Sequence, residues 1–172
     1  LQPVRIGRAR WQTVSSGLHH STAIRYDGAL WAWGRNEYGQ LGDGTKNSHS
    51  EPIPVQALGT WKDIATGSHH TIGLNTDGSL VSWGRNHIGQ LGDGTQNNRT
   101  FPLRIGHNRT WKRIAANYNN CAALAADNSL WIWGSNDQGQ RAHATPARLY
   151  TPGRIGKEND WWHIAIGQSH CI

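Results

Sequence analysis

The sequence predicts an all-β protein made of propeller blades, each blade a sheet of four short antiparallel strands. Three observations lead to this fold class. The chain repeats itself every 50 residues, and the repeat is marked by Trp11, Trp61, Trp111 and Trp161. Within one period, short apolar runs alternate with glycine-rich turns. No segment shows a sustained 3.6-residue hydrophobic period, so helices are not expected.

The second copy shows the four expected strands in order. Residues 61–67 form an apolar run that glycine closes, and residues 71–74 form a second run. The Asp-Gly pair at 77–78 favours the positive-φ turn of a two-residue hairpin. Residues 80–83 then alternate between the two faces of a sheet, and a last strand is expected at 103–105, directly after a proline.

A glycine-rich heptapeptide, G-Q-L-G-D-G-T, follows the third strand of the first two copies, at residues 39–45 and 89–95. It superficially resembles a phosphate-binding loop. Such a loop requires a Lys-Ser/Thr pair or a following helix, and neither is present. We therefore expect a structural turn in which Asp43 and Asp93 accept backbone N–H bonds.

The 50-residue period divides the chain into blades at 11–60, 61–110 and 111–160. Residues 1–10 match the last strand of a preceding blade, and residues 161–172 match the start of a further one. Joined together, these two ends would still lack a third strand, so we expect an incomplete arc of a larger ring. A two-fold dimer would give six whole blades and two defective ones, which disfavours closure by self-assembly.

Three coupled blocks carry a family resemblance: W-x-x-I-A-x-G-x-x-H, D-G-x-L-W-x-W-G and G-Q-L-G-D-G-T. Together they resemble the repeats of the regulator of chromosome condensation family over essentially the whole chain. The resemblance implies an arc of a seven-bladed propeller. It also implies several functions: nucleotide exchange on a small GTPase, inhibition of a secreted enzyme, or scaffolding. Because no residue here can be assigned to exchange, we expect a protein-protein interaction scaffold. Exchange, and small-ligand or carbohydrate binding by a propeller face, are the alternatives.

Charge and hydropathy limit the classes of partner that the chain is expected to bind. The 172 residues include 17 Lys and Arg against 11 Asp and Glu, giving a net charge of +6 that no basic run concentrates. This balance suits an acidic protein partner and disfavours nucleic acid. The remaining blades of the same ring are the other expected partner. Neither a signal peptide nor a membrane-spanning stretch is visible, so no membrane is expected and the compartment is left open.

No catalytic constellation stands out from the repeat, and most acidic residues are assigned to turns, so neither an enzyme nor a cofactor is expected. His20, His70 and His170 occupy one position of the repeat, which Asn120 fills in the third copy. Convergent imidazoles could bind a metal ion. Replacement by asparagine fits a hydrogen-bonding role toward strand backbones better, and no metal is expected.

Cys121 and Cys171 also share one repeat position. Small residues fill this position in the other copies, which indicates a buried site. Equivalent positions in neighbouring repeats seldom come within the roughly 7 Å Cα separation that a disulfide tolerates. Buried free thiols are therefore expected.

Loop positions that differ between copies are the candidate contact residues, because a rigid scaffold builds its recognition surface there. One set of these positions directly follows the glycine at the end of the first strand of each copy. The other set directly follows the W-G-x-N block at the end of the third strand. The third copy departs most, where G-Q-R-A-H-A-T replaces the heptapeptide. The candidates are Leu18, His19, Ser68, His69, Tyr118, Asn119, Tyr38, His87, Asp137, Arg141 and His143. Trp162, which lies outside the recurrent tryptophan positions, would favour ligand binding.

Overall fold

The computed structural model contains three separate sheets of four antiparallel strands and describes residues 9–56, 59–137, 139 and 148–168. The described part of the chain contains no helix, and hence none that could span a membrane. The first sheet comprises β1 (Trp11–Ser16), β2 (His20–Arg25), β3 (Leu30–Gly34) and β4 (His49–Pro54). The second comprises β5 (Trp61–Thr66), β6 (His70–Asn75), β7 (Leu80–Gly84) and β8 (Arg99–Ile105). The third comprises β9 (Trp111–Asn117), β10 (Asn120–Ala125), β11 (Leu130–Ser135) and β12 (Arg148–Ile155).

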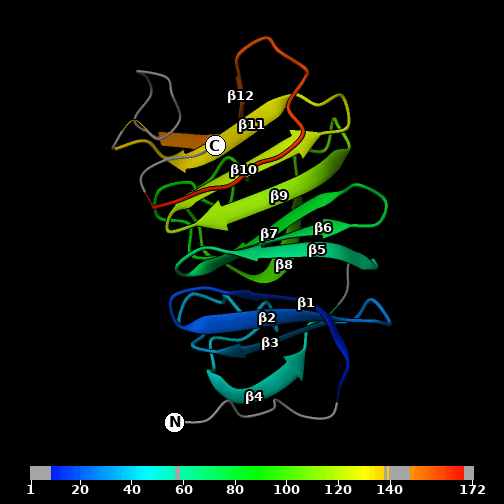
Figure 1. Cartoon of the computed structure of the whole chain (residues 1–172). Coiled ribbons are helices and arrows are strands. Elements are labelled where there is room, and N and C mark those ends of the chain that lie inside the picture. The colour runs from blue at the N-terminus through cyan, green and yellow to red at the C-terminus, as the bar shows by residue number, and fades with distance from the viewer. Residues whose placement is uncertain (1–8, 57–58, 138, 140–147, 169–172) are drawn as a thin grey trace.

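The strands of each sheet pair in chain order, so each sheet is a simple meander. The sheets follow one another from bottom to top in Figure 1. The first strand of each sheet packs against the first two strands of its neighbour: β5 against β1 and β2, and β9 against β5 and β6. Sheets that meet face to face in this way are propeller blades. The predicted all-β propeller arc is confirmed, and we call the three sheets blades 1, 2 and 3.

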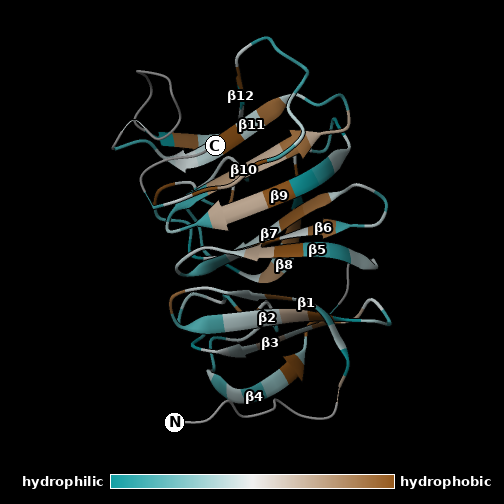
Figure 2. Ribbon diagram, in the orientation of Figure 1, coloured by the Kyte–Doolittle hydropathy of each residue, from teal (hydrophilic) through white to brown (hydrophobic). Residues whose placement is uncertain are grey.

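The hydrophobic cores lie between the blades. Ile24 and Leu30 of blade 1 pack with Trp61, Ile64 and Trp83 of blade 2. A second core joins blades 2 and 3, and a third joins blade 3 to residues 161–168 through Ile164. Figure 2 shows hydrophobic residues along β10 and β11 of blade 3. Each blade therefore depends on its neighbours for burial of its faces.

The glycine-rich heptapeptide holds the tryptophan of the next blade. The Trp83 indole N–H donates to the carbonyl of Gln40 at 2.9 Å, and that of Trp133 donates to Gln90 at 3.0 Å. Both indoles are fully buried. The heptapeptide therefore fastens neighbouring blades, which explains why it recurs with the blades.

The two heptapeptide aspartates also act within the turn. The Asp43 carboxylate accepts the N–H of Thr45 at 3.0 Å, and Asp93 accepts that of Thr95 at 2.9 Å. Hydrogen bonds from their neighbours outweigh desolvation and lower the pKa of both carboxyl groups. The predicted structural role of these aspartates is confirmed.

Gly92→Ala should destabilise the junction between blades 2 and 3. Gly92 has φ +72°, and a Cβ there would stand 2.7 Å from Trp133 Nε1. Backbone strain and the clash together should lower the free energy of unfolding by about 2–4 kcal/mol, measured by urea unfolding. Gly139→Ala is the matched control, because Gly139 has the same φ and no described residue lies within 4 Å of its Cβ position. An equal loss in both variants would show that the Trp133 contact contributes nothing.

The hairpin turns are longer than predicted. β2 ends at Arg25 and β3 begins at Leu30, so four residues connect them. In this turn only Gly28 has a positive φ, 79°, whereas a two-residue type I′ hairpin needs two such residues. The Asp27 carboxylate accepts the N–H of Ala29 at 3.1 Å and closes the turn. The prediction of a two-residue hairpin is wrong, because the aspartate side chain stabilises the longer turn.

The outer strand of blade 2 is also longer than predicted. β8 starts at Arg99 and runs through Pro102 rather than beginning after it. Proline lacks the N–H that a central strand needs on both sides. β8 is the last strand of its sheet and pairs there only with β7, so it tolerates the proline.

Candidate functional site

The β1–β2 and β5–β6 turns lie beside the loops that follow β3 and β7, at one end of the blades. The backbone N–H of Arg35 donates to the carbonyl of His19 at 2.8 Å, and Arg85 donates to His69 at 2.9 Å. We call this end the loop face. The backbone N–H of Ser135 donates in the same way to the carbonyl of Asn119 at 3.2 Å, so the described residues of the loop face are 17–19, 35–38, 67–69, 85–88, 117–119 and 135–137.

Four of the predicted contact residues meet on the loop face across the junction of blades 1 and 2. The rings of His19 and His69 have centroids 6.0 Å apart, and Tyr38 lies 5.3 Å from His69 and 6.0 Å from His87. The Arg85 guanidinium lies over the Tyr38 ring at 5.0 Å. These five residues form one group, which we call the ring cluster.

The ring cluster is flanked by positive charge. Desolvation lowers the pKa of His69, the charges of Arg85, His19 and Arg35 lower it further, and Glu37 opposes them. His69 is therefore neutral at physiological pH. Glu37 is itself paired with Arg35 at 2.6 Å. The cluster thus presents neutral rings, exposed imidazoles and an arginine that is stacked on tyrosine.

A second group of predicted residues borders a cavity of about 490 Å³ where the ends of β1, β5 and β9 meet. Leu18 is 60% exposed and Tyr118 45% exposed, whereas Ser68 is buried between them. Their backbones are linked: Leu18 N–H donates to Ser68 at 3.3 Å, and Ser68 N–H donates to Tyr118 at 2.9 Å. The three turns therefore form one continuous edge.

Tyr118 has φ +47°, in the left-handed region that a bulky residue rarely occupies. The third copy has Asn117 and Tyr118 where the earlier copies have Gly17-Leu18 and Gly67-Ser68. Strained backbone of this kind persists where the surrounding structure imposes it, often at functional sites. Here it fixes an exposed tyrosine at the rim of the cavity.

The remaining predicted residues are placed differently. Asn119 belongs to the loop face in blade 3, where its side chain accepts a hydrogen bond from the Gln90 side chain at 3.4 Å. Asp137 is exposed and accepts from the Ser135 hydroxyl of its own loop at 2.9 Å. Arg141 and His143 lie outside the described residues.

The repeated histidine position links side chains of neighbouring blades. Thr71 donates its hydroxyl hydrogen to the Gln40 carbonyl at 2.9 Å, so its oxygen accepts from His20 Nε2 at 3.0 Å. His70 Nε2 lies 3.0 Å from Cys121 Sγ in the same way. The predicted hydrogen-bonding role holds for His20 and His70, but the predicted partners, strand backbones, are wrong. The buried Asn120 side chain has no hydrogen-bond partner among the described residues. The blades pack closely enough for the ring to reach the next blade.

Burial shifts the pKa values of the three titratable groups in these links, His20, His70 and Cys121. Desolvation lowers the pKa of His20 to about 4 and that of His70 to about 3, and it raises the pKa of the Cys121 thiol. Cys121 is a buried free thiol, as predicted, and Cys171 lies outside the described residues. Within the described ranges, no group of three or more His, Cys, Asp or Glu could hold a metal ion.

Sequence reasoning misses Arg35 and Arg85 on the loop face. Both stand in the W-G-x-N block, which recurs and therefore resembles scaffold. A signal is nevertheless present, because the variable position of this block reads Arg, Arg and Ser in the three copies. Trp162 lies at the opposite end of the blades, where it is 77% exposed and borders a cavity with Lys62, Lys112 and Arg113.

Comparisons with solved structures support the architecture. The structure of human WBSCR16 matches with a TM-score of 0.84 at 26% sequence identity, covering 95% of this chain and 44% of that chain. Prp20p from Saccharomyces cerevisiae matches with a TM-score of 0.78 at 22% identity, covering 88% of this chain and 39% of that chain. The chain therefore spans less than half the length of either protein.

Sequence comparisons identify the repeat. Protein RCC2 of Mus musculus is 47% identical over 51 residues, which are 28% of this chain and 10% of that protein. A model of the "Regulator of chromosome condensation (RCC1) repeat" matches residues 27–74 and 77–124. A second model of the same description matches residues 11–40, 61–90 and 111–140. Since the matched residues make up more than half of the sequence, the chain belongs to the regulator of chromosome condensation (RCC1) repeat family.

Proposed function

We propose that this chain is a protein-interaction scaffold that binds a protein partner through the loop face. The observation that carries the proposal is the ring cluster, in which rings of His19, Tyr38, His69 and His87 converge with Arg85 from two blades. Tyrosine and arginine are enriched where interfaces concentrate their binding energy. The exposed Leu18 and Tyr118 extend this surface toward blade 3.

The charge of the loop face favours a partner with an acidic surface. Arg35 is paired with Glu37, whereas among the described residues no ion pair includes Arg85, which lies over the Tyr38 ring. Opposite charge across an interface speeds association and fixes orientation. We therefore infer that carboxylates of the partner lie against Arg85 and its neighbours.

One structurally similar protein binds protein partners. Prp20p of Saccharomyces cerevisiae has binding properties toward Gsp1p and histones. At 22% identity this likeness supports the fold alone, so those partners are not transferred to this chain. Nucleotide exchange has no described residue of this chain to carry it, and ligand binding rests on the single exposed indole of Trp162.

Removing the ring cluster should abolish capture of the partner. The tagged chain is purified from its native source beside the triple variant His19→Ala/Tyr38→Ala/His69→Ala, and the stoichiometric partner is identified by mass spectrometry. The dissociation constant is then measured for each form with the purified partner. We expect the triple variant to bind at least about tenfold more weakly, because several interface anchors are lost together.

Tyr26→Ala is the control for this experiment. Tyr26 is 71% exposed in the β2–β3 turn, at the opposite end of the same blade. It should bind the partner like the unmodified chain. Unchanged affinity in the triple variant, or an equal loss in Tyr26→Ala, would contradict binding through the loop face.

A further inference from the structure

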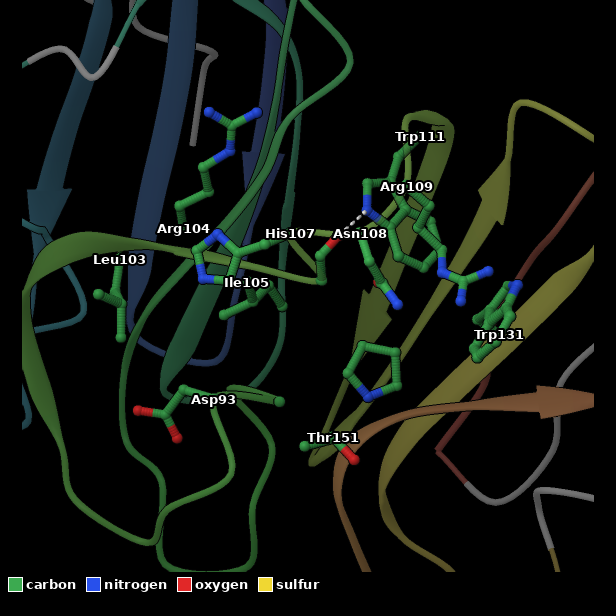
Figure 3. A pocket seen from close by; sticks show the side chains of 13 residues that line it. Asp93, Leu103, Arg104, Ile105, His107, Asn108, Arg109, Trp111, Trp131 and Thr151 are labelled. Carbon is green, nitrogen blue, oxygen red and sulfur yellow. Dashed lines mark hydrogen bonds between the residues drawn. The ribbon is translucent and has the colours of Figure 1, made fainter.

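A groove lies between the outer parts of blades 2 and 3, away from the ring cluster. It encloses about 440 Å³ and is bordered by the end of β8, residues 106–109, Trp131 of β11 and Thr151 of β12. Figure 3 shows these segments on opposite sides of an open space, with Asp93 and Thr151 near one end. A volume of this size accommodates a short peptide segment or a small ligand.

The groove is open because a large side chain is missing from this junction. Between blades 1 and 2, the Phe101 ring lies directly against Gly44 of the heptapeptide. One repeat later, Thr151 and Gly94 hold these positions, and a Cβ on Gly94 would stand 3.8 Å from the Thr151 methyl group. The two junctions are built from equivalent segments of the repeat. Replacement of the Phe101 side chain by that of Thr151 therefore leaves the space between blades 2 and 3 unfilled.

The open junction also carries residues that its counterpart lacks. The Arg109 guanidinium lies 3.8 Å from the centre of the Trp131 ring. The equivalent positions of blades 1 and 2 hold Gly59 and Val81. A guanidinium stacked on an indole keeps its N–H edge free for a carboxylate. His107 and Asn108 add polar groups at the same rim, and both are exposed.

The acids near the groove are already engaged. Asp93 pairs with Arg99 at 2.8 Å, and the Asp127 carboxylate accepts from the hydroxyl of Ser129. Among the residues that the structure describes, no ion pair includes Arg109, whose charge acts on Asp127 only as a minor cause, after Ser129 and Arg154, of the lowered pKa of that carboxyl group. The groove therefore offers an arginine to an incoming negative charge.

An extended peptide suits the shape of the site. β8 is the last strand of its sheet. The Thr100 carbonyl already accepts the N–H of Gly44 at 2.9 Å and Pro102 has no N–H, so the part of its outer edge considered for the peptide is residues 103–105. Edge strands bind extended peptides through backbone hydrogen bonds. Leu103, which is 37% exposed, supplies an apolar contact beside this edge.

We propose that the groove between blades 2 and 3 binds an extended acidic peptide segment, with a carboxylate on Arg109 and the peptide backbone along β8. This site is separate from the loop face and does not depend on the proposed function. Arg109, which has no counterpart at the preceding junction, would give the site its specificity. The small side chain of Thr151 leaves the space that the peptide would occupy.

The full chain, labelled with ¹⁵N, is titrated with the probe acetyl-(Glu-Val)₃-amide, and the indole N–H signals are followed by NMR. The acidic peptide should shift the Trp131 and Trp111 signals, whereas acetyl-(Lys-Val)₃-amide should not. Arg109→Gln should raise the dissociation constant about tenfold or more, because a charge-assisted hydrogen bond is lost. Thr151→Phe should block binding by installing the side chain of the first junction.

Arg25→Gln is the matched control. The Arg25 guanidinium lies over Trp31 at 5.6 Å in blade 1, so the variant removes the same charge and stacking type elsewhere. It should bind the acidic probe with unchanged affinity. The proposal is overturned if the acidic probe shifts neither indole signal, if the lysine probe binds equally well, or if Arg109→Gln and folded Thr151→Phe bind as the unmodified chain does.

Discussion

Replacing Trp83 with alanine is expected to lower the free energy of unfolding by about 3–5 kcal/mol. Its indole is fully buried between blades 1 and 2, stacks edge-on against Trp61 at 5.7 Å, and donates to the Gln40 carbonyl at 2.9 Å. Alanine would leave a large cavity and would remove one of the two hydrogen bonds that the Gln40 carbonyl accepts, the other coming from Thr71. Urea unfolding, followed by circular dichroism, measures the loss.

Trp162→Ala is the control for this prediction. Trp162 is 77% exposed, so its replacement should change the free energy of unfolding by less than about 0.5 kcal/mol. Similar losses in the two variants would show that the buried tryptophans do not hold the blades together.

Mild acid is expected to destabilise the protein strongly through His20 and His70. Both are buried and neutral, with pKa values lowered from 6.5 to about 4 and about 3, mainly by desolvation. The unfolded chain binds protons at these histidines below about pH 6.5, whereas the folded chain does not. Stability is therefore complete above this pH and falls with decreasing pH, by about 2 kcal/mol for each histidine at pH 5.

The double variant His20→Asn/His70→Asn isolates this effect. Asparagine occupies the same repeat position at Asn120, so the fold accepts it there. The variant should be less stable at neutral pH, because it loses the bonds to Thr71 and Cys121. Its stability should nevertheless change much less between about pH 7.5 and pH 5. An unchanged pH dependence in this variant would assign the acid sensitivity to other groups.

The sequence was sufficient to predict the blades because every repeat obeys the same packing rules. The tryptophan period, the Asp-Gly turns and the heptapeptide all recur at fixed spacing, so each copy supports the interpretation of the others. The length of the turn at 26–29 could not be deduced in this way. It depends on the bond between Asp27 and the N–H of Ala29, which an Asp-Gly pair alone does not reveal.

The candidate site was only partly predictable. Variation between copies singled out His19, Tyr38, His69 and His87, but their convergence depends on how two blades pack. The stacking of Arg85 on Tyr38 crosses the same junction, so the sequence spacing of these residues gives no sign of it.

The groove between blades 2 and 3 was also only partly predictable from the sequence. The change from Phe101 to Thr151 is visible in the sequence. Its consequence appears only when the structure places each residue against the heptapeptide of the preceding blade. The histidine links to Thr71 and Cys121 were missed for a related reason, because their partners lie 51 residues further along the chain.

Site-specific photo-crosslinking tests binding through the loop face most directly. A photoreactive phenylalanine derivative replaces Tyr38 in one variant and Tyr26 in another. These two tyrosines lie at opposite ends of blade 1, and the first belongs to the ring cluster. On irradiation of the complex with its partner, we expect the partner to be crosslinked from position 38 and not from position 26. Crosslinking from position 26 alone, or equally from both positions, would contradict the account.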